Sequence, residues 1–367
     1  MRVLATVERY APAIGGAERV VQRVAEGLAA RGHEVHVMTG GPREDGELGG
    51  VQVHRLPISG NEARGIRGDE SSVASLIARV EPDVVFNYAA QTWATDCCFR
   101  LLERRERPRM VLAPCGFSGL GKRRYEPYFA AMGERLRLYD ALILHSSVYQ
   151  DWDFASAAGV ERMFIVPNAA DRPTGEAESS STRADGSVAV TVGSHVVSKG
   201  HAQFARAIRA LRRERAITGT IVAPTRHGLD ALRGCQMTCR ARAQLQSLRL
   251  IDGSVPGAVE DAVAGADLFL FTSRVECAPL VILEAMAAGK PWVSYDVGNV
   301  SELAGGVVVA SFEELVGAAR QILDGSLAHL GAEGRAAWKA SHRWEDVVPR
   351  YESIFSEVLD GRSALGA

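Results

Sequence analysis

The chain has 367 residues, 47% of them hydrophobic and 23% charged, which is ordinary for a globular protein with a full core. It carries 42 basic and 44 acidic residues, for a formal net charge of −2, and this balance excludes a general electrostatic attraction to nucleic acid or to anionic membranes. The length exceeds what one typical domain needs and suits two.

Cysteine content and hydropathy indicate the compartment. Six cysteines in a chain of this length are too sparse for a disulfide-stapled secreted domain. The longest apolar runs fall short of the roughly 18 residues that span a bilayer, and the first residues lack the apolar core of a signal peptide. We therefore expect a cytoplasmic protein without a transmembrane segment, either a monomer or a homodimer.

The first half of the chain alternates apolar strands with helical patterns. Val3–Val7 is predicted to be a buried strand, Ala17–Ala30 has an apolar stripe at helical spacing, and His33–Met38 returns as a strand. This β-α-β order is typical of a parallel sheet. The further strands predicted here are Val84–Asn87, Met110–Pro114, Ala141–His145 and Phe164–Val166.

The second half repeats this organisation. Residues 168–186 are polar, Ser-rich and interrupted by Pro and Gly, which predicts a linker. After it come a strand at Val188–Val192, a loop and a helix from about His201 to Arg213. The later strands are predicted at Thr218–Ala223, Leu248–Ile251, Leu268–Thr272 and Trp292–Tyr295. We therefore expect an α/β protein with two Rossmann-like domains facing each other across a cleft.

Two loops have the composition of anion sites. Gly15 and Gly16 stand between the first strand and the first helix, where glycines allow close backbone approach and a helix start offers free N–H groups. A simple turn explains them equally well. The loop Gly193–Gly200, GSHVVSKG, ends with Lys199 at a loop-to-helix junction, where its point charge suits a diphosphate. The plain alternative is a solvated surface lysine.

The most informative stretch holds two glutamates, Glu276 and Glu284, with seven residues between them. A predicted strand ends just before Glu276, and Pro279 is expected at the first position of a helix, where its missing N–H costs nothing. Glu284 lies among apolar neighbours, so its carboxylate needs a partner or a ligand. This arrangement suits a phosphorylated sugar, because carboxylates accept from hydroxyls and helix N–H groups donate to phosphate.

Taken together, these pieces resemble the retaining glycosyltransferases of family 4, which have the GT-B fold. The resemblance covers nearly the whole chain. It rests on the Gly15-Gly16 loop, VPN at Val166–Asn168, G-x5-K-G at Gly193–Gly200, ADLFLFTS at Ala266–Ser273, E-x7-E at Glu276–Glu284, EAMAAGKP at Glu284–Pro291 and the ending Trp344…Tyr351. The E-x7-E with the following EAMAAGKP is its specific element.

The resemblance implies a division of labour along the chain. Residues 1–167 would form the acceptor domain, with a last helix within 344–367 that crosses back to it. Residues 168–186 would be the linker, and residues 187–343 the nucleotide-sugar donor domain. The implied reaction transfers a hexose or amino-hexose from a nucleoside-diphosphate sugar, UDP-sugar first, to a hydroxyl acceptor with retained configuration. No metal and no other cofactor are expected. The acceptor would be a small molecule, a carrier-bound intermediate or a glycan.

The resemblance also implies roles for particular residues. Glu276, Lys199 and Gly16 would be catalytic, since the burden is to stabilise the departing diphosphate. The residues implied at the donor are Gly15, Gly16, Ser194, His195, Lys199, Val255, Glu276, Ala278, Pro279, Leu280 and Glu284. For the acceptor we expect strand-end polar groups and a basic Gly-rich loop. These residues are Asn87, Tyr88, Gln91, Cys115, Gly116, Ser118, Lys122 and Arg123.

The sequence departs from the family pattern at three places. Ser194 stands where many relatives have an Arg, so one diphosphate cation is missing. Cys115 stands where many have a His that could help acid/base chemistry. The turn Cys277-Ala278-Pro279 replaces a Gly-rich one and is expected to change the fit of the donor sugar.

Two alternatives stay open. A nucleotide-sugar 2-epimerase of GT-B shape would need an acid/base pair in the first half, which the sequence does not offer. A non-catalytic nucleotide-sugar or glycan-binding protein is favoured by the missing Arg and His. Outside these motifs, Cys235 and Cys239 have only His227 near them in sequence, which is too few ligands for zinc. They are expected to be ordinary thiols or a redox pair.

Overall fold

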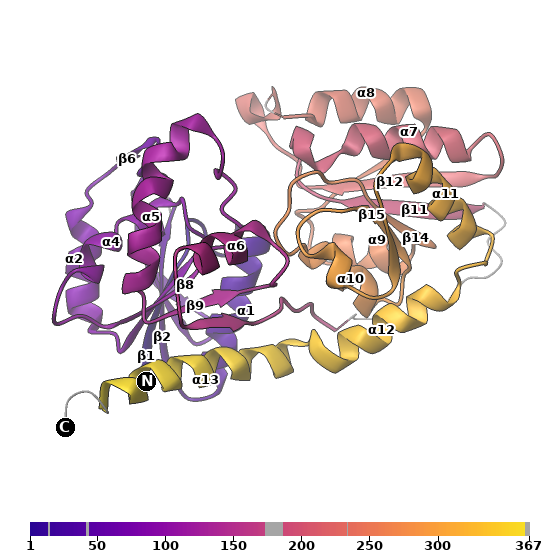
Figure 1. Ribbon diagram of the computed structural model, residues 1–367. Helices are drawn as coiled ribbons and strands as arrows, with labels where there is room; N and C mark the ends of the chain where they lie inside the picture. The colour runs from indigo at the N-terminus through magenta and orange to yellow at the C-terminus, as the bar shows by residue number, and fades with distance from the viewer. Residues whose placement is uncertain (14, 42–43, 173–185, 233, 364–367) are drawn as a thin grey trace. The chain divides into compact units, whose positions relative to one another are not determined.

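The computed structural model describes residues 1–13, 15–41, 44–172, 186–232 and 234–363 (Figure 1). The chain divides into two compact units. Unit 1 comprises residues 1–168 and the segment from Trp344 onward, and unit 2 comprises residues 169–343. Most of the linker expected at 168–186 lies outside the described residues, which omit 173–185.

Unit 1 is built on an eight-stranded sheet in the order β10-β9-β8-β7-β1-β2-β4-β3, parallel except for the pair β3–β4. Its strands are β1 (Arg2–Thr6), β2 (Glu34–Gly40), β3 (Gly46–Leu48), β4 (Val51–Leu56), β7 (Val84–Tyr88), β8 (Arg109–Ala113), β9 (Ala141–Leu144) and β10 (Met163–Ile165). A separate antiparallel ribbon pairs β5 (Ser59–Asn61) with β6 (Gly65–Arg67). The sequence did not predict β3 to β6; β3, β5 and β6 have only three residues each.

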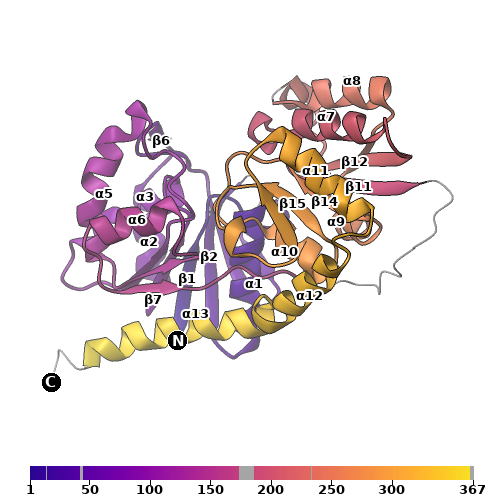
Figure 2. The ribbon, with the colours of Figure 1, turned by 45° about the vertical axis from the view of Figure 1, so that its right-hand side comes forward.

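Helices cover both faces of this sheet. They are α1 (Gly16–Ala30), α2 (Ser71–Val80), α3 (Trp93–Asp96), α4 (Phe99–Leu102), η1 (Arg123–Tyr125), α5 (Glu126–Leu138), α6 (Gln150–Ala157) and α13 (Trp344–Ser363). Helices α1 and α13 pack against each other, and Tyr351 and Phe355 of α13 lie 5.6 and 5.3 Å from the ring of Phe86 on β7. Figures 1 and 2 show α13 running along unit 1. The prediction that the last helix returns to the first domain is confirmed.

A buried acid lies on the other face of the sheet, among α2 to α6. Asp96 accepts hydrogen bonds from the backbone N–H of Glu62 at 2.8 Å and the hydroxyl of Tyr128 at 3.0 Å. Burial raises the pKa of Asp96 to about 7, which outweighs these two bonds. The folded protein therefore holds a proton on Asp96 at pH values where the unfolded chain has lost it.

This proton makes stability depend on pH. Between about pH 4 and pH 7 the unfolded chain binds fewer protons at Asp96 than the folded protein, so the free energy of unfolding falls as pH rises, by up to about 1.4 kcal/mol per pH unit. We expect Asp96→Asn to flatten this fall, measured by urea unfolding at several pH values. Asp153→Asn, which changes an exposed aspartate of unit 1, is the control. Equal slopes in the two variants would contradict the assignment.

Unit 2 has a six-stranded, fully parallel sheet in the order β13-β12-β11-β14-β15-β16. Its strands are β11 (Ser187–Val192), β12 (Ile217–Ala223), β13 (Arg249–Asp252), β14 (Leu268–Phe271), β15 (Trp292–Tyr295) and β16 (Gly306–Val309). The chain moves outward from β11 to β13, then returns to β14 on the other side. Parallel α/β sheets bind ligands where the strand order reverses in this way, here at the carboxyl ends of β11 and β14.

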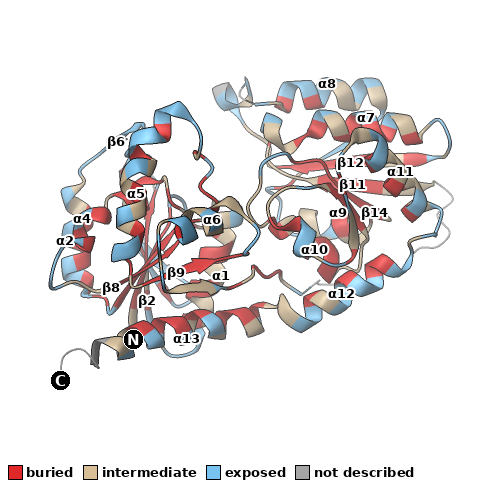
Figure 3. Cartoon of the chain, viewed as in Figure 1, coloured by how far each residue is buried: buried red, intermediate tan, exposed pale blue. Residues whose placement is uncertain are grey.

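The helices of unit 2 form two layers around this sheet. They are η2 (Val197–Lys199), α7 (His201–Leu211), η3 (Gly228–Leu232), α8 (Gln236–Gln246), α9 (Ala258–Ala264), α10 (Leu280–Ala287), η4 (Val300–Glu302), α11 (Phe312–Leu323) and α12 (His329–Ser341). Helices α7 and α11 pack on one face and α9 and α10 on the other (Figures 1 and 2). Figure 3 shows the strands of both units mostly buried. Among the described helices, none combines the length and apolar character needed to cross a membrane.

Candidate functional site

An ion pair lies where the central strands of unit 2 end. Lys199 closes η2 after β11, and Glu276 lies in the loop after β14. Their side chains meet, with Lys199 Nζ 2.7 Å from Glu276 Oε1, and both are partly shielded from water. These residues are 77 positions apart in sequence and come together because β11 and β14 are parallel neighbours. The structure thus brings together two of the residues expected at the donor.

Backbone contacts fix the loop that carries Lys199. Ser198 O accepts from the backbone N–H of Arg274 at 2.8 Å and from the hydroxyl of Ser273 at 3.3 Å. The hydroxyl of Thr272 donates to Gly200 O at 3.0 Å. Gly200 has φ +72°, and a Cβ built there would lie 1.8 Å from Thr272 O, so only glycine permits this approach. The lysine is therefore held on a rigid turn.

We expect Gly200→Ala to lower the free energy of unfolding of unit 2 by about 3 kcal/mol or more, because the clash adds to the strain of a left-handed backbone. Gly325→Ala is a matched control in the same unit. Gly325 has φ +83° and nothing within 4 Å of its Cβ position, so it should lose only about 1 kcal/mol. Urea unfolding followed by circular dichroism measures both. Similar losses in the two variants would show that the close packing of Gly200 against Thr272 does not determine the loss of stability.

A second turn, after β15, supports the loop that holds Glu276. Gly298 has φ +59°, and a Cβ there would lie 2.2 Å from Cys277 O, while the backbone N–H of Asn299 donates to the same oxygen at 2.9 Å.

The expected position of Pro279 needs a correction. Its ψ of 113° is extended, so it precedes α10 as the N-cap, and the first helical residue is Leu280.

Glu284 lies on α10, whose neighbouring side chains Ile282, Leu283, Ala285 and Met286 are all buried. Glu284 itself is only partly buried, and its Oε2 atom is shielded from water. The N–H groups of Leu280 and Val281 start the helix, where no intrahelical acceptor exists. This unit therefore presents an ammonium group, two carboxylates and a helix start near one edge of its sheet.

The remaining donor predictions in unit 2 fall into different environments. Ser194 and Ala278 are partly buried, and Val255 is exposed in the turn after β13. His195 is 5% exposed, with Nδ1 4.0 Å from Cys235 Sγ. Its ring therefore lies beside a cysteine, and its expected role at the diphosphate stays a prediction.

Gly15 and Gly16 start α1 in unit 1, with Gly15 as the N-cap. A Cβ at Gly15 would lie 2.2 Å from a carboxylate oxygen of Glu18, so a larger residue would collide with this buried acid. Glu18 pairs with Arg9 at 2.9 Å. Gly16 is exposed. Its expected role beside a phosphate stays a prediction.

Three neighbouring strand ends in unit 1 meet in a buried hydrogen-bonded chain. The hydroxyl of Tyr88, the last residue of β7, lies 3.0 Å from Nε2 of His145, which follows β9. Sγ of Cys115, which follows β8, donates to that hydroxyl at 3.7 Å. His145 Nδ1 lies 3.0 Å from Val166 O. Burial alone would lower the pKa of His145, but its bonds with Cys115 and Val166 outweigh burial and raise it. Sequence reasoning found no histidine beside Cys115, because only the strand order places His145 there.

The predicted acceptor residues divide into core and surface groups. Asn87 is 0% exposed and its amide bonds to Thr6 at 2.8 Å and to Tyr139 at 2.9 Å. Tyr88 is 1% exposed. Both are buried in this conformation, and their expected role at the acceptor stays a prediction.

The loop after β8 forms the surface group. Gln91 Oε1 accepts from the backbone N–H of Gly119 at 3.0 Å and so braces this loop. Gly116 is buried, and its N–H donates to Asp151 Oδ2 at 3.0 Å. Ser118, Lys122 and Arg123 are exposed. The loop therefore offers a hydroxyl and two cations to solvent on a braced backbone.

Comparison with protein families covers both units. A family model described as Glycosyltransferase Family 4 matches residues 14–173, and one described as Glycosyl transferases group 1 matches residues 186–325. The chain belongs to glycosyltransferase family 4. The family 4 resemblance predicted from the sequence is thereby confirmed, and with it the GT-B fold.

Solved glycosyltransferase structures match this family 4 chain along nearly its whole length. Sucrose-phosphate synthase from Thermosynechococcus elongatus has a TM-score of 0.78 and 17% identity, covering 98% of this chain and 99% of that one. Anabaena Alr3699/HepE, in complex with UDP and glucose, has a TM-score of 0.70 and 17% identity, covering 96% and 99%. Trehalose-6-phosphate synthase OtsA has a TM-score of 0.73 and 14% identity, covering 98% and 99%. At these identities the likeness establishes the fold. A search of curated protein sequences gave no match.

Proposed function

We propose that this glycosyltransferase moves a hexose or amino-hexose from a nucleoside-diphosphate sugar to a hydroxyl acceptor with retained anomeric configuration. Among such donors, UDP-sugars are favoured. The observation that carries the proposal is the pair Lys199–Glu276, held at 2.7 Å at the strand-order reversal of unit 2. A cation beside a carboxylate suits the two ends of a diphosphate sugar, which are anionic phosphate and neutral hydroxyls.

The proposed reaction requires stabilisation of the negative charge on the departing diphosphate. The Lys199 ammonium has three N–H donors, and Glu276 takes one of them, which leaves donors for phosphate oxygens. The N–H groups of Leu280 and Val281 add the partial positive charge of a helix start. Preorganised donors of this kind can supply the charge stabilisation that some transferases obtain from a divalent cation. We therefore propose that catalysis needs no metal.

Glu284 would bind the ribose hydroxyls and Glu276 a hydroxyl of the transferred sugar. Both carboxylates are partly buried, which strengthens hydrogen bonds to neutral hydroxyls relative to water. The complex of Alr3699/HepE with UDP and glucose supports UDP as the nucleotide to test first.

The acceptor would approach the braced loop after β8 in unit 1. Lys122 and Arg123 are exposed there beside Ser118, which favours an acceptor that carries both a hydroxyl and a negative charge. The hydrogen-bonded chain Cys115–Tyr88–His145 includes Cys115 at the start of this loop and would fix its backbone.

A thermal-shift screen tests the donor first. UDP, GDP, TDP and ADP, each also as its glucose ester, are added to the full chain, and we expect a rise in Tm with one nucleotide family, UDP first. No rise with any of them would overturn the donor assignment. The slow release of sugar to water then separates a transferase from a non-catalytic binder, which shifts Tm but releases none. Proton NMR of the freshly released sugar tests retention, since an α-linked donor should yield the α-anomer before mutarotation. Inversion, or a change at carbon 2 of the donor, would overturn the proposed mechanism.

A further inference from the structure

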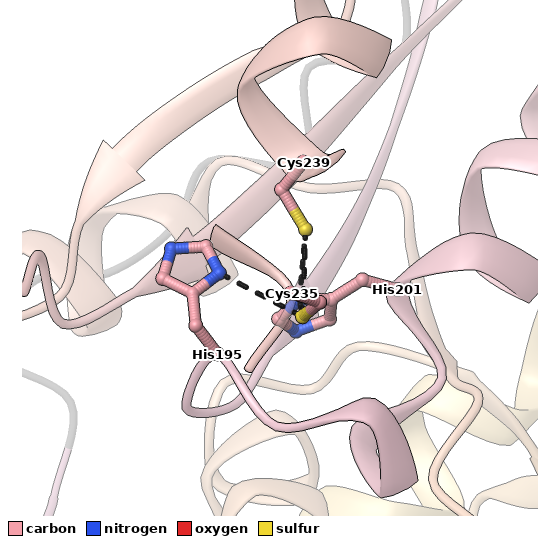
Figure 4. Close-up of side chains that lie close together, drawn as sticks. All are labelled: His195, His201, Cys235 and Cys239. Carbon is pink, nitrogen blue, oxygen red and sulfur yellow. Dashed lines mark hydrogen bonds between the residues drawn. The ribbon is translucent and has the colours of Figure 1, made fainter. Parts of the chain in front are cut away.

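Four side chains from three segments of unit 2 converge at one point. They are His195 in the loop after β11, His201 at the start of α7, Cys235 at the N-cap of α8 and Cys239 in its first turn. One ligand atom from each lies within 4.8 Å of all the others. Figure 4 shows these side chains grouped around Cys235. The cluster contains two thiols and two imidazoles, and His227, the only ligand suggested by proximity in sequence, is exposed and outside it.

The distances between these atoms match a tetrahedral zinc site. With Zn–S near 2.3 Å and Zn–N near 2.05 Å, tetrahedral angles require about 3.8 Å between sulfurs and about 3.6 Å between sulfur and nitrogen. Cys239 Sγ lies 3.7 Å from Cys235 Sγ. His201 Nδ1 lies 3.5 Å from Cys235 Sγ and 3.4 Å from Cys239 Sγ, and His195 Nδ1 lies 4.0 Å from Cys235 Sγ.

We propose that this cluster binds a structural Zn²⁺ ion through Cys235, Cys239, His195 and His201. Thiolate and imidazole ligands in a four-coordinate set favour zinc over the oxygen-seeking Mg²⁺ and Ca²⁺. Five residues separate the histidines and three separate the cysteines, both within the spacings of known Cys₂His₂ sites. Metal binding releases the thiol protons, and the two thiolates then neutralise the 2+ charge. The proposal replaces the sequence-based expectation that the chain binds no metal.

The backbone around the cluster is shaped for close approach of the segments. Gly234 has φ +72°, and a Cβ there would lie 1.8 Å from the carbonyl oxygen of His195. The backbone N–H of Cys235 donates to that same oxygen at 3.3 Å. His195, His201 and Cys239 are buried and Cys235 is partly buried, so the cluster is shielded from water. A buried site with all four positions filled by protein ligands is structural rather than catalytic.

The ion would brace the loop that carries Lys199. His195 and His201 flank Lys199 in sequence, and the loop is already fastened on its other side to residues 272–274. Zinc would tie this loop to the start of α8, and would therefore fix the side of the loop that these bonds leave unfastened. A role as a zinc ligand would explain why a histidine stands at position 195 of this loop.

Metal content of the full chain tests the site. After reduction and incubation with Zn²⁺ alone, followed by gel filtration, we expect about one zinc per chain by mass spectrometry of the metal. Cys235→Ser, Cys239→Ser and His201→Gln should each lose it, whereas Cys97→Ser, at a thiol of unit 1, should retain it. Co²⁺ in place of Zn²⁺ should give the visible bands of a tetrahedral ion and thiolate charge transfer in the near ultraviolet.

Two results would overturn the proposal. One is reduced wild-type protein that retains no zinc. The other is a Cys235–Cys239 disulfide in the metal-free protein as purified, which would make the cysteines a redox pair. Because a cysteine variant can fail to fold, the proposal is also tested on the wild-type protein by hydrogen exchange. Hydrogen exchange with and without Zn²⁺ should show protection concentrated in residues 193–201 and 234–239, and unchanged exchange in both segments would contradict the bracing role. None of these measurements requires a sugar donor, so failure here is distinct from failure of the proposed function.

Discussion

Replacing Lys199 with Ala should lower kcat for sugar transfer, or for donor hydrolysis, by about 10²–10³-fold, the range found when one preorganised donor to a developing anion is removed. The ammonium is proposed to meet charge that grows on the diphosphate as the bond to the sugar breaks, so kcat falls more than KM changes. The free energy of unfolding should change by no more than about 2 kcal/mol, because the Lys199–Glu276 pair is partly exposed. Initial rates with the nucleotide sugar identified by thermal shift measure the first effect, and urea unfolding the second.

Lys339→Ala is the matched control, because it removes the same charge from an exposed position on α12 in the same unit. It should leave kcat unchanged. A Lys199→Ala variant with wild-type kcat would contradict the proposed role of Lys199. A loss of kcat matched by a loss of folded protein would assign Lys199 to stability instead.

Substitutions of the two glutamates should have different effects on the affinities for the free nucleotide and for the nucleotide sugar. Glu284→Gln, at the proposed ribose contact, is expected to weaken UDP and UDP-sugar equally, about 10- to 100-fold, since a hydrogen bond to a charged group contributes about 1.5–3 kcal/mol. Glu276→Gln should weaken UDP-sugar and leave UDP nearly unchanged, because only the sugar is proposed to reach Glu276. Isothermal titration calorimetry with both ligands measures the four affinities.

Glu333→Gln, an exposed glutamate on α12, controls for the loss of one negative charge in unit 2. It should change neither affinity. If Glu276→Gln weakened UDP as strongly as UDP-sugar, the assignment of the two acids would be wrong. Tighter UDP binding by Glu276→Gln would show that the carboxylate mainly competes with phosphate for Lys199.

The strands of the fold were predicted well wherever an apolar run is buried on both faces. The sequence predicts Trp292–Tyr295 as a strand, and the structure has β15 at the same residues. The predicted strand Val84–Asn87 corresponds to β7 at Val84–Tyr88. Such runs are visible because central parallel strands need apolar side chains throughout. The edge strand β3 is exposed along its whole length, so Gly46–Leu48 has no apolar pattern to detect.

The sequence by itself was enough to predict the GT-B fold and the family, because these follow from motifs contiguous in the chain. The same motifs select Lys199, Glu276 and Glu284 as candidate site residues, whose roles stay predictions. Tertiary structure alone decided which side chains meet. Lys199 reaches Glu276 because β11 neighbours β14, and His195 reaches Cys235 because β11 also neighbours β12. Residues that follow adjacent parallel strands share one edge of the sheet however far apart they are in sequence. Since periodicity reveals strands but not their order, the histidine–cysteine cluster became visible only once that order was known.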